Sequence, residues 1–137
     1  WHRLDPWPDS VGGLMRLKSR LTIATLSNGN VSLLSNMAKH IGLSWDVILS
    51  AEIAKHYKPD PEAYLHSAEL LSLPPDQVMM VAAHKGDLMA AQRVGLKTAF
   101  VARPAEKGPD NDVDVTREAW MDLYALDFHD LAEQLGC

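Results

Sequence analysis

The sequence has a single cysteine, Cys137, at its last position, so no disulfide can form within the chain. Thiols stay reduced inside cells, and we therefore expect a cytoplasmic protein. No apolar run approaches the roughly 18 residues that a membrane span requires. Positive charge is also scarce, because the chain has 13 Lys and Arg residues but 18 Asp and Glu residues. We expect neither a nucleic acid nor a membrane as partner, whereas a small anionic substrate needs only a locally basic pocket.

The sequence also lacks an initiating Met and an apolar signal segment, since it opens with Trp1, His2 and Arg3. Internal repeats and low-complexity stretches are absent. Its 137 residues are 47% hydrophobic and 23% charged, as in an ordinary globular protein. We therefore expect one domain over residues 1–137, from which an earlier part of the polypeptide is missing.

Short β-prone runs alternate with helical patterns along the chain. The sequence predicts strands at 21–26, 45–49, 78–82, 97–101 and 122–126, and helices at 11–19, 31–41, 59–71, 87–95 and 127–135. A polar loop is expected over 103–117. This alternation predicts an α/β fold, a Rossmann-like parallel sheet with helices on both faces. Ligands of such sheets bind beyond the carboxyl ends of the strands.

Polar side chains gather at three of these strand ends. Ser27 and Asn28 follow the first strand, Lys58 and Tyr64 follow the second, and 82–87 follow the third. Hydroxyl and amide donors, a cation and a carboxylate are the groups needed to bind a small anion and to orient an ionised group beside it. Each also has a structural interpretation: Asp87 could be a helix cap, Lys58 a solvated loop residue and His84 a surface histidine. Their order along successive strands favours the functional interpretation.

These segments resemble the haloacid dehalogenase superfamily, and within it the type II L-2-haloacid dehalogenases. Thr25–Asn30 is similar to the second motif of the family, Lys58–Pro61 with Tyr64 to the third, and Val81–Asp87 to the fourth. Trp7–Val11 resembles the return from the cap domain to the core. The resemblance implies that residues 1–137 are the C-terminal part of the core domain, without the first motif and the cap.

The resemblance also implies a reaction. A nucleophilic Asp, which lies outside this chain, would displace halide from a 2-haloalkanoic acid, and water would hydrolyse the resulting ester. The family pattern assigns catalytic roles to Lys58, Asp87 and Ser27, and substrate-binding roles to Asn28, Tyr64 and His84. Lys58 would hold the nucleophile, Asp87 would pair with Lys58 and help position the water, and Asn28 would help hold the departing halide. No cofactor or metal is implied, and family members are often homodimers.

The fourth motif departs from well-studied dehalogenases, which tend to have Ser, Asn and an aromatic residue where Ala82, His84 and Gly86 stand. His84 could replace the Asn as a hydrogen-bonding partner. A phosphatase of the same superfamily is the alternative enzyme, and it would need Mg²⁺ held by acidic residues. Ala83 stands where such a phosphatase has an Asp, which favours the dehalogenase. A non-catalytic, truncated relative is the third interpretation.

The missing first motif has a structural consequence. In the superfamily its strand lies between those predicted at 21–26 and 78–82, so we expect unpaired backbone groups and an apolar gap there. The chain alone should therefore be unstable or inactive. The letters of Asp112–Thr116 match those of the first motif. The segment before them, 108–111, is not predicted to be a buried strand, so we do not assign the nucleophile to Asp112 or Asp114.

Overall fold

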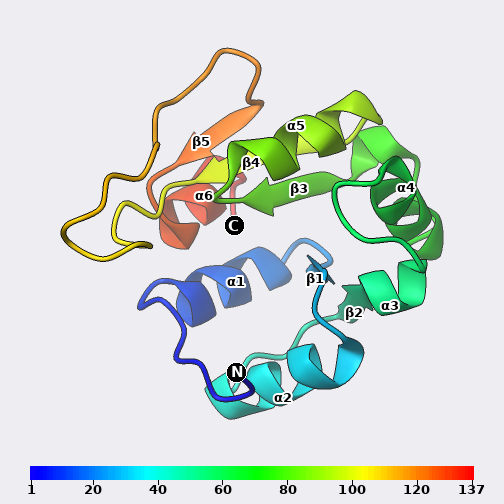
Figure 1. Ribbon diagram of the computed structural model, residues 1–137, viewed down its shortest axis with the longest axis horizontal. Helices are drawn as coiled ribbons and strands as arrows, with labels where there is room; N and C mark the ends of the chain where they lie inside the picture. Colours follow the sequence, from blue (N-terminus) through cyan, green and yellow to red (C-terminus); the bar gives the residue numbers. More distant parts are fainter.

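The structure is a computed structural model that describes residues 1–137 (Figure 1). Its helices are α1 (Ser10–Lys18), α2 (Val31–Ile41), α3 (Ala51–Ala54), α4 (Pro61–Leu70), α5 (Lys85–Arg93) and α6 (Phe128–Gln134), with a 3₁₀ turn at Pro75–Gln77. Its strands are β1 (Ala24–Ser27), β2 (Val47–Ser50), β3 (Met79–Ala82), β4 (Lys97–Val101) and β5 (Leu123–Ala125). None of the helices combines the length and the apolar composition needed to traverse a bilayer.

All strand pairs are parallel, and the predicted α/β fold is confirmed. The sequence patterns missed two short elements, α3 and the 3₁₀ turn. They also placed the start of α5 two residues late, because His84 is its N-cap and Asp87 lies in its first turn. The interpretation of Asp87 as a helix cap is therefore wrong.

Alternate residues of β4 pack on opposite faces of the three-stranded sheet. Ala99 and Val101 belong to a core with α1 and α6, whereas Phe100, together with Ala102 just after the strand, belongs to a core with α4 and α5. Because successive side chains of a strand point to opposite faces, one apolar strand serves both cores. Figure 1 shows the resulting layers, with α5 on one side of β3 and β4 and with α6 and α1 on the other.

Gly13 allows a close contact between α1 and α6. A Cβ atom on Gly13 of α1 would lie 2.3 Å from the Cβ atom of Phe128 in α6. Only a residue without a side chain allows the two helices to approach this closely. A substitution of Gly13 would therefore push α6 away from α1 and open the core that they share.

A partly buried ion pair joins the irregular first segment to the end of β4. A guanidinium nitrogen of Arg103 lies 2.8 Å from the Asp9 carboxylate, and the guanidinium lies 5.4 Å from the ring centroids of both Trp7 and Phe128. Burial alone would raise the pKa of Asp9, but hydrogen bonds from the Phe128 N–H and from Arg103 outweigh it, and the pKa is lowered. The pair ties residues 7–9 to the edge at which β4 ends.

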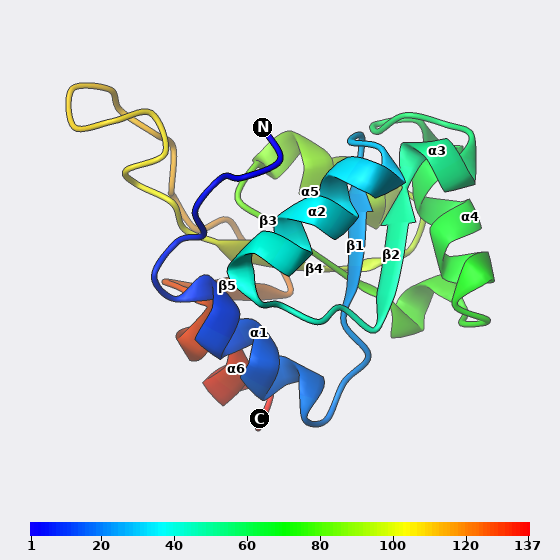
Figure 2. The same ribbon diagram turned by 90° about the horizontal axis from the view of Figure 1, so that it is seen from below.

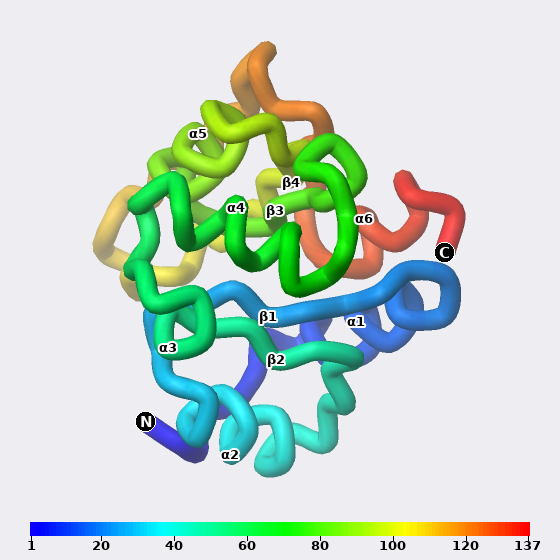
Figure 3. The backbone as a smooth tube through the Cα atoms, turned by 90° about the vertical axis from the view of Figure 1, so that its right-hand side faces the viewer, coloured from blue at the N-terminus to red at the C-terminus, as the bar shows by residue number.

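The strands form two separate sheets, β1–β2 and β3–β4–β5, rather than one. Figure 3 shows β1 beside β2, with β3 and β4 forming the other group. A cavity of about 720 Å³ lies between β1 and β3, and 19 of its 27 lining residues are hydrophobic. The edges of β1 and β3 that face this cavity have no strand partner. The structure thus shows the apolar gap that the sequence predicts.

We predict that the 137-residue chain alone binds a hydrophobic dye such as anilinonaphthalene sulfonate under native conditions, because the cavity leaves apolar surface accessible. The measurement is dye fluorescence together with near-ultraviolet circular dichroism. A matched control substitutes Lys in place of Val81, which lines the cavity, and should reduce the fluorescence. A chain that binds no dye and melts cooperatively at high temperature would contradict the prediction.

Candidate active site

The carboxyl ends of the parallel strands meet at one edge of the molecule. Ser27, Ser50, Ala82 and Val101 are the last residues of β1 to β4. Figure 2 shows β1 and β2 pointing the same way, with the long loop over 103–119 projecting near that edge. The segments that leave these strands carry the polar residues singled out in the sequence.

Lys58 and Tyr64 both contact Asp87. Lys58 Nζ lies 2.5 Å from one carboxylate oxygen of Asp87, and the Tyr64 hydroxyl donates to the other oxygen at 2.6 Å. The Lys58 and Asp87 side chains are each 17% exposed. Since α4 carries Tyr64 and α5 carries Asp87, the packing of these two helices fixes the triplet. Both oxygens of the carboxylate are thus held by donors from the α3–α4 region.

Burial raises the pKa of the Tyr64 phenol far above its usual value, and the hydrogen bond to Asp87 and its negative charge raise it further. Tyr64 has no exposed surface. It therefore stays protonated and acts as a fixed donor to Asp87. The structure places Tyr64 against Asp87, and its predicted substrate-binding role stays a prediction.

Asn28 holds the backbone of Lys58. The Lys58 N–H donates to Asn28 Oδ1 at 2.7 Å, and Asn28 Nδ2 donates to the Lys58 carbonyl at 3.1 Å. The Lys58–Pro59 peptide bond is cis. The side chain of Asn28 thus positions Lys58, a contact that the sequence did not indicate. Its predicted role in holding substrate and halide stays a prediction.

Lys58 has donor capacity left over. An ammonium group has three N–H donors, and Asp87 accepts one of them. The Ser27 hydroxyl accepts the Gly29 N–H at 3.0 Å, which leaves its own proton available for donation. Ser27 also lines the apolar cavity. The cavity therefore offers the Ser27 hydroxyl to an anionic group, and the Lys58 ammonium has two further donors of its own.

His84 lies apart from this triplet. Its Nε2 atom is 2.7 Å from a carboxylate oxygen of Glu106, and its side chain is 67% exposed. The structure therefore does not place His84 in contact with Lys58, Tyr64 or Asp87, and its predicted substrate-binding role stays a prediction. No sequence pattern indicated Glu106, which belongs to the polar loop 22 residues further along the chain.

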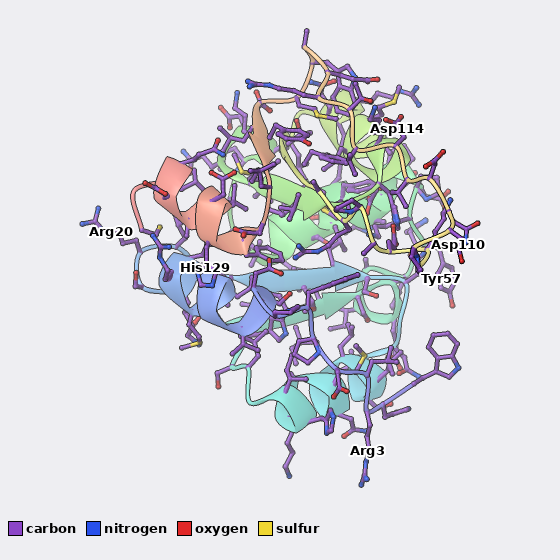
Figure 4. The ribbon with its side chains drawn as sticks, turned by 90° about the vertical axis from the view of Figure 1, so that its left-hand side faces the viewer. Arg3, Arg20, Tyr57, Asp110, Asp114 and His129 are labelled. Atoms are coloured by element: carbon purple, nitrogen blue, oxygen red, sulfur yellow. The ribbon has the colours of Figure 1, made fainter.

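Lys85 anchors the same loop. Its Nζ atom lies 2.8 Å from Asp114 and 3.1 Å from Glu118. The hydrogen bond from Lys85, with a second one from the Thr116 N–H, lowers the pKa of Asp114 to about 2. Figure 4 shows Asp110 and Asp114 on the loop. The first-motif string at 112–116 thus lies in irregular structure, and its second Asp is an anchor for the loop.

The family model described as haloacid dehalogenase-like hydrolase matches residues 1–95. An (S)-2-haloacid dehalogenase of Xanthobacter autotrophicus is 32% identical over 109 residues, which cover 78% of this chain and 43% of that relative. A phosphoglycolate phosphatase of Neisseria meningitidis is 31% identical over 93 residues, 66% of this chain and 40% of the relative. This chain spans about half the length of the curated relatives it matches.

Solved structures of L-2-haloacid dehalogenases are also similar to this chain. A defluorinating L-2-haloacid dehalogenase is 52% identical, with a TM-score of 0.96, over 100% of this chain and 56% of that one. Another L-2-haloacid dehalogenase is also 52% identical, with a TM-score of 0.94, over 98% of this chain and 60% of that one. The three motifs at the strand ends, the fold and these matches agree, and this chain belongs to the haloacid dehalogenase-like hydrolase family.

Proposed function

We propose that this chain is the core part of an L-2-haloacid dehalogenase, a hydrolase that removes halide from 2-haloalkanoic acids. The proposal rests mainly on the ammonium group of Lys58. Its Nζ atom lies 2.5 Å from a carboxylate oxygen of Asp87, and two of its N–H donors remain for a second anion. A second carboxylate placed beside it would be held ionised and in a fixed direction. That carboxylate would come from outside residues 1–137.

The proposed reaction has two steps. A carboxylate oxygen of the external Asp attacks the carbon that bears the halogen, the carbon–halogen bond breaks, and halide leaves with the bonding electrons. Water then attacks the carbonyl carbon of the ester, which regenerates the carboxylate and gives a 2-hydroxy acid and a proton. Lys58 would stabilise the ionised nucleophile before the first step and after the second. No metal or cofactor takes part in either step.

We also propose where the external Asp enters. An apolar strand parallel to β1 and β3 would fill the cavity of about 720 Å³ and pair with both free strand edges. The residue at its carboxyl end would then emerge between Ser27 and Asp87, next to Lys58. The parallel direction of all present strands supports this orientation.

The other predicted residues surround that position. Ser27 would donate its free hydroxyl proton to the nucleophile or to the substrate carboxylate. Asn28 would support Lys58 and help hold the substrate. Tyr64 would restrain Asp87, which in turn would help position the hydrolytic water, and His84 would contact the leaving group or the substrate.

The phosphatase alternative is less well supported by the geometry. A Mg²⁺ ion would need free carboxylate oxygens, but both oxygens of Asp87 are engaged by Lys58 and Tyr64. Ala83 supplies no ligand. The 52% identity to solved L-2-haloacid dehalogenases also exceeds the 31% identity to phosphoglycolate phosphatase. A cytoplasmic location and a homodimer are further parts of the proposal, the first supported by the single cysteine.

The test of this function uses the full-length protein that carries the proposed nucleophilic Asp. The protein is assayed on 2-chloropropionate, on 2-fluoropropionate and on a phosphate ester, each with and without a chelator. Chelator-insensitive release of halide and lactate is expected. Chelator-sensitive phosphate release would favour the phosphatase, and absence of both activities would favour a non-catalytic relative.

We predict that Tyr64→Phe lowers kcat about tenfold, because it removes one hydrogen bond to a charged group without changing the packing volume. Tyr124→Phe is the matched control, since its hydroxyl donates at 2.8 Å to the carbonyl of Val115, which lies between the loop anchors Asp114 and Glu118. The control should keep the activity of the natural protein. Equal losses in both variants, measured by halide release at saturating substrate, would contradict the assigned role of Tyr64.

A further inference from the structure

Two carboxylates join the β1 and β2 segments, one at each end of the strand pair. At the amino end, Asp46 Oδ2 accepts the Ile23 N–H at 2.9 Å. At the carboxyl end, Glu52 Oε2 accepts the Val31 N–H at 2.9 Å. The contact of Glu52 lies at the end from which the site residue Lys58 emerges, whereas the contact of Asp46 lies at the opposite end.

The backbone around Glu52 is well fixed. Ser27 pairs with Ser50 in the strand register, so β1 and β2 end side by side. Ser50 has no exposed surface, and its hydroxyl accepts the Glu52 N–H at 3.2 Å and caps α3. Ala51 and Ala54 of α3 are also buried. The helix α3 is therefore a firm base from which the exposed Glu52 reaches the start of α2, and Figure 2 shows α3 and the first turn of α2 at the end to which β1 and β2 point.

Glu52 accepts a donor that α2 cannot satisfy within itself. The first N–H groups of a helix have no partner inside the helix. The Asn30 side chain accepts the Leu33 N–H at 2.9 Å, and Glu52 accepts the Val31 N–H. A carboxylate is also favoured at a helix N-terminus by the helix dipole. Both effects stabilise the contact between α3 and α2.

The turn between β1 and α2 carries the residue that holds Lys58. Asn28 binds the N–H and the carbonyl of Lys58, and Val31 begins α2 three residues later. The turn is thus joined to the segment after β2 at both of its ends, by Asn28 to Lys58 and by Val31 to Glu52. If the start of α2 separated from α3, the short turn would carry Asn28 away from Lys58.

We propose that Glu52 is a positioning residue that holds the start of α2 against α3 and thereby maintains the two Asn28 hydrogen bonds that align Lys58. The inference rests on the proposed dehalogenase function, in which the Lys58 ammonium orients the nucleophilic carboxylate. Without the Glu52 contact, the ammonium is aligned with the nucleophile for less of the time, and the chemical step slows. A contact that only stabilised the fold would leave the rate of the folded enzyme unchanged.

The test removes the contact from either side in the full-length protein that carries the nucleophile. Glu52→Ala removes the acceptor and no buried surface, because the side chain is exposed. Val31→Pro removes the donor at the first position of α2, where proline is well tolerated. Glu52→Gln keeps an acceptor oxygen. Asp46→Ala is the matched control, because it removes the corresponding contact to Ile23 at the far end of the same strand pair.

Halide release from 2-chloropropionate gives kcat and KM, and amide hydrogen exchange gives the protection of the Lys58 N–H. We expect Glu52→Ala and Val31→Pro each to lower kcat about fivefold, the effect of one hydrogen bond, with little change in KM and with faster exchange at Lys58. The double variant should be no slower than either single variant, because both remove the same bond. Glu52→Gln and Asp46→Ala should keep most of kcat and the protection of Lys58.

Unchanged kcat, or unchanged exchange at Lys58, in both Glu52→Ala and Val31→Pro would overturn the inference. An equal fall of kcat in Asp46→Ala would also overturn it, because the loss would then follow from general stability. If the natural protein releases no halide, the proposed function fails instead. Exchange at the Lys58 N–H still reports on the Glu52 contact in that case, so the two failures are distinguishable.

Discussion

The ion pair between Lys58 and Asp87 joins the two halves of the molecule at its functional edge. Lys58 is held through its backbone by Asn28, which follows β1, and Asp87 stands on α5, which follows β3. The two strands belong to different sheets, so the pair spans the boundary between them. Partly buried charges of this kind are costly to separate, because each would be left without a partner. The pair therefore fixes the distance between the sheets where the chemistry is proposed to occur.

The cavity between the sheets links stability to activity. Its apolar lining and the free edges of β1 and β3 match the proposed additional parallel strand. A strand that filled it would bury apolar surface, complete the backbone hydrogen bonds and deliver its last residues to Lys58. The same event would thus finish the fold and supply the nucleophile.

Local sequence patterns predicted most of the fold, because strands and helices depend on nearby residues. The apolar runs near 78–82 and 97–101 became β3 and β4, and Gly42 ends α2 in the left-handed conformation. Lys58, Tyr64 and Asp87 were identifiable because each follows a predicted strand and together they resemble family motifs. The short helix α3 was missed because four residues carry no periodicity that distinguishes them from a turn.

Contacts between distant side chains were not predictable in this way. Arg103 and Asp9 are 94 residues apart, and nothing in either neighbourhood indicates the pairing. The same holds for Glu106, whose loop lacks any regular pattern, and for the double contact of Asn28 with the Lys58 backbone. Such contacts depend on how the elements pack, which a single sequence does not show.

The most direct test of the central claim is a double-mutant cycle on Lys58→Met and Asp87→Asn, measured as kcat/KM for 2-chloropropionate in the protein that carries the nucleophile. Residues that act as a unit are not additive. We predict that the double variant is about as slow as Lys58→Met alone. Losses that multiply, as for two independent residues, would contradict the account.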